Sequence, residues 1–139
     1  MRMDQKWDIE KITHFFFLLV NATDVSGKNI LEKRFKKDPE TYKKLISVFS
    51  MIGVLGYKDG LEFGFSTHYF DSIKSSVSRL IEIRKFSDLW RVLSYNSMQN
   101  ELIVMLDAFE AHKHTSTTKA AQSVKEKAKI VEVLLEWSE

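Results

Sequence analysis

The residues whose types and spacing most clearly suggest a chemical role are the lysines and the single arginine between Lys28 and Lys44. This segment holds seven basic and three acidic residues, a local charge of +4, whereas the whole chain has a formal net charge of +2. Clustered cations attract the phosphate backbone of nucleic acids. Surface helices are also lysine-rich because they are solvated, and the sequence leaves both interpretations open. We name these seven residues the basic segment: Lys28, Lys33, Arg34, Lys36, Lys37, Lys43 and Lys44.

A possible metal site lies further along the chain. Asp107, Glu110 and His114 fall at i, i+3 and i+7, so on a helix they would share one face, with His112 nearby. Helices also end in histidine and lysine because cations are favoured at the negative end of the helix dipole, and we prefer that interpretation. We therefore predict no metal site.

Motifs for catalysis are missing from the sequence. No serine lies in a Gly-x-Ser-x-Gly turn, and no glycine-rich phosphate loop precedes a predicted helix. The chain has no cysteine, which excludes disulfides and thiolate chemistry. We therefore predict a protein that is not an enzyme and has no catalytic residue and no cofactor.

The strongest secondary-structure signal is the start of a helix at Asp38-Pro39-Glu40. Asp38 would cap the helix, and Pro39 is favoured at the first helical position because no N–H is needed there. Gly53 and Gly56 would end it. Apolar residues recur at three- and four-residue spacing on one side, at Tyr42, Leu45, Ile46, Phe49 and Ile52, and Lys43, Ser47 and Ser50 share the other side.

A β-hairpin is predicted directly after this helix. Two short apolar-rich runs between Val54 and Phe65 flank Lys58-Asp59-Gly60. Asp-Gly favours a two-residue hairpin turn because both positions tolerate positive φ. Upstream, we expect a helix over residues 7–23 and a short helix over residues 28–37. Residues 1–66 are thus predicted to form three helices and a hairpin.

Residues 42–55 together with Gly56 to Ser66 resemble the recognition helix and wing of winged-helix proteins. These include transcription regulators and the N-terminal domains of some small-molecule methyltransferases. The resemblance covers residues 28–66 and implies a DNA-binding surface. No arginine lies between Glu40 and Gly53, so bidentate guanine recognition by that helix is excluded. The resemblance implies phosphate contacts by Lys28, Lys33, Lys36, Lys37, Lys43 and Lys44, groove contacts by Thr41, Ser47 and Ser50, and a wing contact by Lys58.

Residues 67–139 are predicted to be helical. The last helix, from about Thr118 to Trp137, carries an apolar seam at alternating three- and four-residue spacing. The seam predicts a homodimer, or alternatively an intramolecular bundle against helices that carry Leu80 and Leu106. The predicted dimer interface consists of Ala121, Val124, Ala128, Val131 and Leu135.

The complete prediction is a mainly α fold. A winged-helix-like region (1–66) precedes a helical bundle or dimerisation extension (67–139), and a single core shared by both regions is an alternative. With 139 residues, 44% apolar and 29% charged, the composition is that of a globular protein. The longest apolar run has six residues, too short for a membrane span, and no secretory signal is present, so we expect a cytoplasmic protein.

Two functions follow from this organisation. The first is a nucleic-acid-binding regulator that acts mainly through phosphate contacts to DNA and forms a homodimer. The second is a non-enzymatic protein–protein interaction module, such as an adaptor, an inhibitor or an immunity-type binder, in which the winged-helix-like region is only a scaffold.

Overall fold

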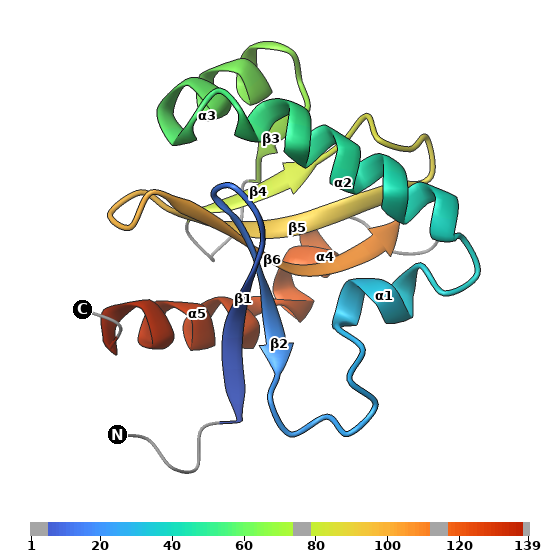
Figure 1. The fold of residues 1–139 in the computed structure, drawn as a ribbon, viewed down its shortest axis with the longest axis vertical. Helices are drawn as coiled ribbons and strands as arrows, with labels where there is room; N and C mark the ends of the chain where they lie inside the picture. Colours follow the sequence, from blue (N-terminus) through green and yellow to red (C-terminus); the bar gives the residue numbers. More distant parts are fainter. Residues whose placement is uncertain (1–5, 74–78, 112–116, 138–139) are drawn as a thin grey trace.

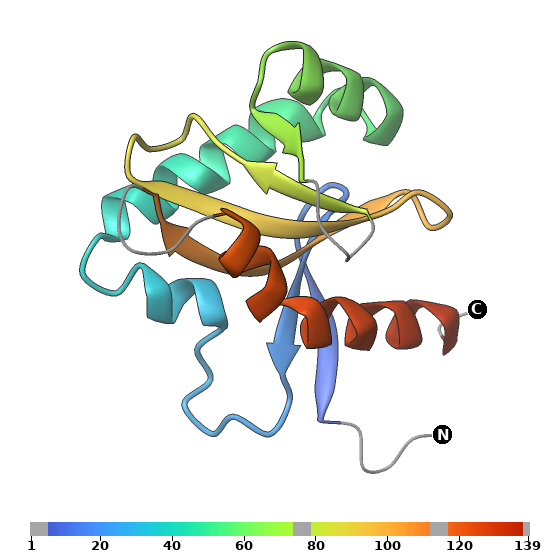
Figure 2. The same cartoon turned by 180° about the vertical axis from the view of Figure 1, so that it is seen from behind.

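The computed structural model describes residues 6–73, 79–111 and 117–137, which form a mixed six-stranded sheet covered by helices (Figures 1 and 2). The strand order is β1-β2-β6-β5-β4-β3, with only β2 and β6 parallel. Strands from both predicted regions therefore build one sheet. The elements are β1 (Trp7–Thr13), β2 (Phe16–Asn21), α1 (Ile30–Arg34), α2 (Pro39–Gly53), α3 (Tyr57–Ser66), β3 (Phe70–Ser72), β4 (Leu80–Ile83), β5 (Trp90–Ser97), β6 (Leu102–Glu110), α4 (Thr117–Ser123) and α5 (Lys125–Trp137).

The sheet separates two apolar cores. Strand β6 shows the division, because Ile103 and Met105 pack with residues of α1 and α2, whereas Val104 and Leu106 pack with residues of α4 and α5. All four side chains are fully buried. Successive side chains of a strand point to opposite faces, so a central strand with helices on both sides must be apolar at every position.

The predicted mainly α, winged-helix fold is wrong, starting with the first element. Residues 7–23 form a hairpin, with Trp7 opposite Asn21 and Ile9 opposite Leu19. Strand β2 then pairs in parallel with β6, where Phe16 lies opposite Ile103. A strand buried on both faces and a helix buried on all sides give the same unbroken apolar run, which periodicity alone does not distinguish.

The predicted helix start at Asp38 is confirmed. The Asp38 carboxylate accepts a hydrogen bond from the Thr41 amide at 3.3 Å, and Pro39 is the first helical residue. The inward face of α2 buries Leu45, Phe49 and Ile52, which the sequence pattern also predicted. Local capping signals identified this helix because they do not depend on what the rest of the chain does.

The predicted wing is a helix, which removes the resemblance to winged-helix proteins. Gly56, with φ of 84°, makes the turn between α2 and α3. Gly60 and Gly64 lie on the buried side of α3, where a Cβ on Gly60 would come within 2.7 Å of Phe15 and one on Gly64 within 2.2 Å of Phe70. These glycines allow close packing against the sheet and do not form a hairpin turn.

Residues 67–110 were predicted to be helical, but their described part forms strands β3, β4, β5 and β6. Their apolar residues fit helical spacing only because strands buried on both faces carry apolar side chains at nearly every position. The final helix prediction is confirmed, with an interruption at Val124 between α4 and α5. No helix in the described part of the chain has the length and apolar character needed to cross a membrane.

The seam proposed as a dimer interface is covered by the sheet of the same chain. Its five residues are at most 5% exposed and pack on the sheet face that carries Leu80 and Leu106. The intramolecular alternative named these two leucines as partners of the seam, but they lie on strands and not on helices. The buried seam residues are Ala121, Val124, Ala128, Val131 and Leu135.

We predict that Gly64→Ala destabilises the protein. Alanine at an open helical site stabilises by ~0.5–1 kcal/mol, but here the new methyl group meets the Phe70 ring, and overpacking costs ~1–3 kcal/mol. Urea unfolding should show a lower midpoint, whereas Glu62→Ala, on the exposed side of α3, should leave it nearly unchanged. An unchanged or higher midpoint for Gly64→Ala would disprove the close contact.

We also predict that Val124→Glu combined with Val131→Glu abolishes cooperative thermal unfolding, because two carboxylates would be buried in the core under α5. Val133→Glu is the matched control, since Val133 is 44% exposed on the same helix. Light scattering should give the mass of one chain for the wild type. A folded double variant of half the wild-type mass would show that the seam joins two chains instead.

Candidate functional site

The basic segment lies on one side of the molecule, in the loop that precedes α1, in α1, in the loop that follows it and in the first half of α2 (Figure 1). Two of its lysines are ion-paired: Lys33 with Asp24, and Lys43 with Glu40 at 3.1 Å. Lys58 lies on α3, beyond the far end of α2, so it does not extend the same surface. The segment's exposed lysines without an ion pair among the described residues are Lys28, Lys36, Lys37 and Lys44.

The predicted groove contacts do not form one surface. Thr41 is 8% exposed, and its hydroxyl donates a hydrogen bond to the Asp38 carboxylate, so it belongs to the helix cap. Ser47 and Ser50 are exposed on α2, but no wing stands beside them. The structure therefore supplies no helix-and-wing surface for base recognition.

A row of charged residues crosses the opposite face of the sheet. Asp71 pairs with Glu82, Glu82 with Leu93, and Leu93 with Asp107, so the four are neighbours in register across β3, β4, β5 and β6. Residues in register point to the same face. Leu93 packs with α4 and α5, which identifies this face as the one that these helices cover. Three carboxylates thus lie along one line across the sheet.

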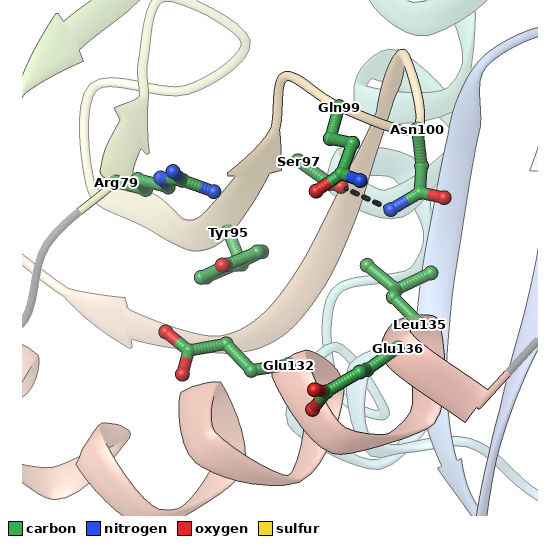
Figure 3. A pocket seen from close by; sticks show the side chains of 8 residues that line it. All are labelled: Arg79, Tyr95, Ser97, Gln99, Asn100, Glu132, Leu135 and Glu136. Atoms are coloured by element: carbon green, nitrogen blue, oxygen red, sulfur yellow. Dashed lines mark hydrogen bonds between the residues drawn. The ribbon is translucent and has the colours of Figure 1, made fainter.

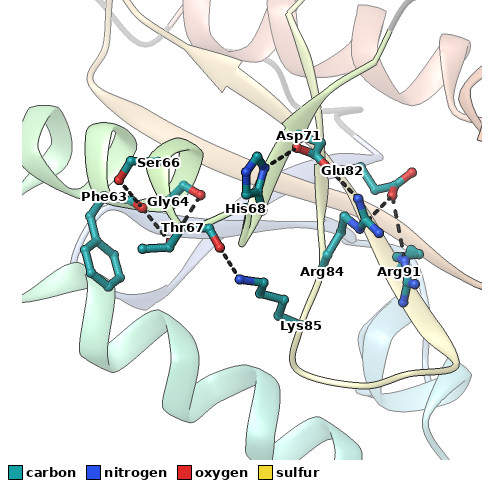
Figure 4. A network of polar contacts seen from close by, with 10 residues as sticks. All are labelled: Phe63, Gly64, Ser66, Thr67, His68, Asp71, Glu82, Arg84, Lys85 and Arg91. Atoms are coloured by element: carbon teal, nitrogen blue, oxygen red, sulfur yellow. Dashed lines mark hydrogen bonds and ion pairs between the residues drawn. The ribbon is translucent and has the colours of Figure 1, made fainter.

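Arginines neutralise the first two of these carboxylates (Figure 4). Glu82 is 8% exposed, with Arg84 Nε at 3.6 Å and Arg91 Nε at 3.7 Å from its Oε1 atom. Arg84 also pairs with Asp71, which has His68 Nδ1 at 3.6 Å from Oδ1. A buried carboxylate is strongly destabilising without such partners, so Glu82 fixes both guanidinium groups against the sheet.

Asp107 joins elements from both sides of the sheet. Arg34, at the end of α1, donates from Nε to Oδ1 at 2.8 Å and from Nη2 to Oδ2 at 3.1 Å. Lys127 of α5 donates to Oδ2 at 3.1 Å. Burial works to raise the pKa of Asp107, but the Arg34 hydrogen bonds, the Lys127 charge and the Ala108 amide together hold it below its ordinary value.

A cavity of about 460 Å³ opens beside Asp107, and we name it the aromatic cavity. Trp90 and Phe109 are partly exposed in it, and Trp90 packs on Phe35 with 4.7 Å between ring centroids. Its cations are Arg34 and Lys119. Strand pairing places Arg91 opposite Phe109, next to the cavity. The lining residues are Arg34, Trp90, Leu93, Asp107, Ala108, Phe109, Glu110, Lys119, Ala120 and Ser123.

The residues considered for a metal site do not have the geometry that suggested it. Asp107 and Glu110 lie on a strand, where positions three apart face opposite sides, and His112 and His114 lie outside the described residues. In the described ranges, no group of three or more histidines and carboxylates could hold a metal ion. The charged row was missed because the segments that carry Glu82, Arg91 and Asp107 were predicted to be helices, on which these residues would not lie side by side. A charged residue inside an apolar strand is the signal that identifies it.

Comparisons with protein-family models, curated proteins and solved structures found no match. The chemistry of the site is therefore the guide to function. The aromatic cavity combines the partly exposed side chains of Trp90 and Phe109 with the guanidinium group of Arg34 and the ammonium group of Lys119, and the exposed Lys36 and Lys37 follow Arg34 in the chain.

We predict that Asp107→Asn weakens the folded state most at neutral pH. A carboxylate whose pKa is depressed by folding contributes stability above its unfolded pKa, near 4, and loses it as the pH falls through the lower folded value. The variant should therefore lose ~1–3 kcal/mol at pH 7, and the difference from wild type should shrink as the pH drops below about 4. Urea unfolding at several pH values measures this, with exposed Glu62→Gln as the control; a pH-independent difference would contradict the ion-pair argument.

Proposed function

We propose that this chain binds single-stranded nucleic acid through the aromatic cavity and the adjacent lysines. The observation that carries the proposal is the presence of Trp90 and Phe109 together with Arg34 and Lys119 in one cavity. Proteins bind single strands with aromatic faces, on which bases stack, and with cations that follow the phosphate backbone. Both components occur here within one cavity of about 460 Å³.

The lysines of the α1–α2 loop extend this site. Arg34 lines the cavity, and Lys36 and Lys37 follow it within three residues. Both are exposed, and neither has an ion pair among the described residues. Packing of Phe35 on Trp90 fixes the start of this loop against the cavity. We expect the loop lysines to contact phosphates next to a base that stacks in the cavity.

Binding of this kind is expected to depend weakly on sequence. Every base offers an aromatic face, and phosphates are the same at each position. Arg34, which could recognise guanine in a bidentate manner, already makes its bidentate contact with Asp107. The proposal thus keeps phosphate contact from the sequence-based hypothesis and discards the helix-and-wing surface.

A protein partner is the second candidate, and an apolar patch favours it. Met51, Val54 and Leu55, at the end of α2, are 44%, 71% and 43% exposed. Exposed large apolar side chains that lie together often mark a protein contact. The patch lies at the opposite end of α2 from the basic segment, so the two functions would use separate surfaces.

We predict that replacing Lys36, Lys37 and Lys119 with glutamine weakens binding to a fluorescein-labelled ~15-nucleotide polypyrimidine strand at least about tenfold at ~50 mM salt. The slope of log affinity against log salt should fall by about 2, since each phosphate contact on a single strand contributes about 0.7. Fluorescence anisotropy measures both. Binding should also quench tryptophan emission, and Trp90→Phe should remove that quenching.

The matched control replaces Lys11, Lys58 and Lys129, which are exposed elsewhere, and so changes the net charge equally. It should retain most of the affinity. Equal losses of affinity in both triple variants would show that binding depends on net charge and not on a defined site. Failure of the unmodified protein to bind the strand at ~50 mM salt, where electrostatic attraction is strong, would refute the proposal.

A further inference from the structure

A second cavity, of about 470 Å³, lies between α5 and the ends of β4 and β5 (Figure 3), and we name it the polar cavity. It is within the size range of small-molecule sites. The turn between β5 and β6 closes one side, where Asn100 donates a hydrogen bond to the Ser97 hydroxyl at 2.9 Å. The lining residues are Arg79, Tyr95, Ser97, Gln99, Asn100, Glu132, Leu135 and Glu136.

The positive and negative side chains of the polar cavity lie on opposite walls. Arg79 enters from the sheet side, and Glu132 and Glu136 enter from α5, where they are one helical turn apart (Figure 3). None of the three forms an ion pair within the described part of the chain. A guanidinium group and two carboxylates thus border the same space without pairing with one another.

Tyr95 forms the floor between these groups. Its side chain is 4% exposed, and its hydroxyl interacts with both Arg79 and Glu132. Burial and the charge of Glu132 raise the pKa of Tyr95 above its ordinary value, although Arg79 opposes this shift. The phenol therefore stays protonated at neutral pH and offers the cavity a neutral hydrogen-bonding group.

Arg79 is held in an uncommon conformation at the cavity wall. Its φ is 64°, in the left-handed region that residues other than glycine seldom adopt. The Asn96 amide donates a hydrogen bond to the Arg79 carbonyl at 2.8 Å, which ties this residue to β5. Strained backbone of this kind often occurs where a side chain must be held toward a ligand.

We propose that the polar cavity binds a zwitterionic small molecule, specifically a free α-amino acid. Arg79 receives the carboxylate, because guanidinium groups bind carboxylates in a bidentate manner. Glu132 receives the ammonium group, and Glu136 adds negative charge on the same wall. The amides of Gln99 and Asn100 border the remaining space. A purely anionic ligand would meet two carboxylates and a purely cationic one would meet Arg79, whereas a zwitterion matches both walls.

The test begins with a thermal-shift screen of the purified chain against each common L-amino acid at ~10 mM, because a ligand bound only by the folded state raises the melting temperature. Calorimetry then compares the best amino acid with its N-acetyl derivative, which lacks the ammonium charge, and its amide, which lacks the carboxylate. Each derivative should bind at least about tenfold more weakly, since a charged hydrogen bond is lost. Absence of any shift, or equal binding of all three compounds, would overturn the proposal.

Variants of Arg79 and Glu132 test separately the proposed contacts with the carboxylate and the ammonium group of the amino acid. Arg79→Gln should weaken the amino acid at least about tenfold but leave the affinity for the amide unchanged. Glu132→Gln should weaken the amino acid yet leave the N-acetyl derivative unchanged. Glu126→Gln, on the exposed side of α5, is the matched control and should bind as wild type. All three should unfold cooperatively, and wild-type affinity in the Arg79 and Glu132 variants would place the amino acid elsewhere. Nucleic-acid binding is unaffected in either case, because the aromatic cavity shares none of these residues.

Discussion

The constraint on which this structure depends is the burial of β2 and β6 on both faces of the sheet. Their side chains alternate between the core under α1 and α2 and the core under α4 and α5. Neither layer of helices can be removed without exposing half of each strand to water. The charged row interrupts this arrangement, and Asp107 is stabilised by Arg34 from one layer and Lys127 from the other.

The features predicted correctly from the sequence are those that depend on interactions between residues close together in the chain. The cap at Asp38, the course of α2 and the helical C-terminus could be predicted because capping and amphipathic spacing act within a few residues. The strands could not, because an apolar run such as Phe15 to Val20 satisfies a buried helix and a doubly buried strand equally. Gly60 was misassigned for a related reason: the sequence shows a glycine, but only the packed structure shows the Phe15 ring that requires it.

The candidate sites were predictable only in part. Clustering of lysines between Lys28 and Lys44 is visible in the sequence; several of them are exposed, and Arg34 of the same segment lines the aromatic cavity. The partnership of Glu82 with Arg91, and of Arg34 with Asp107, arises from strand register and from helix packing across distant segments. Side chains that meet only after the sheet has formed leave no fixed spacing for a motif search to recognise.

The parallel pairing of β2 with β6 has a consequence for the newly made chain. Phe16 pairs with Ile103, which is synthesised much later, so the hairpin of β1 and β2 cannot pair with β6 while the intervening helices and strands are made. At ~5–20 residues per second this interval lasts several seconds, during which β2 offers an unpaired edge to other chains. Charged Asp8, Glu10 and Lys11 lie on β1, the outer strand of this hairpin and an edge strand of the finished sheet, where charged side chains disfavour pairing with other chains.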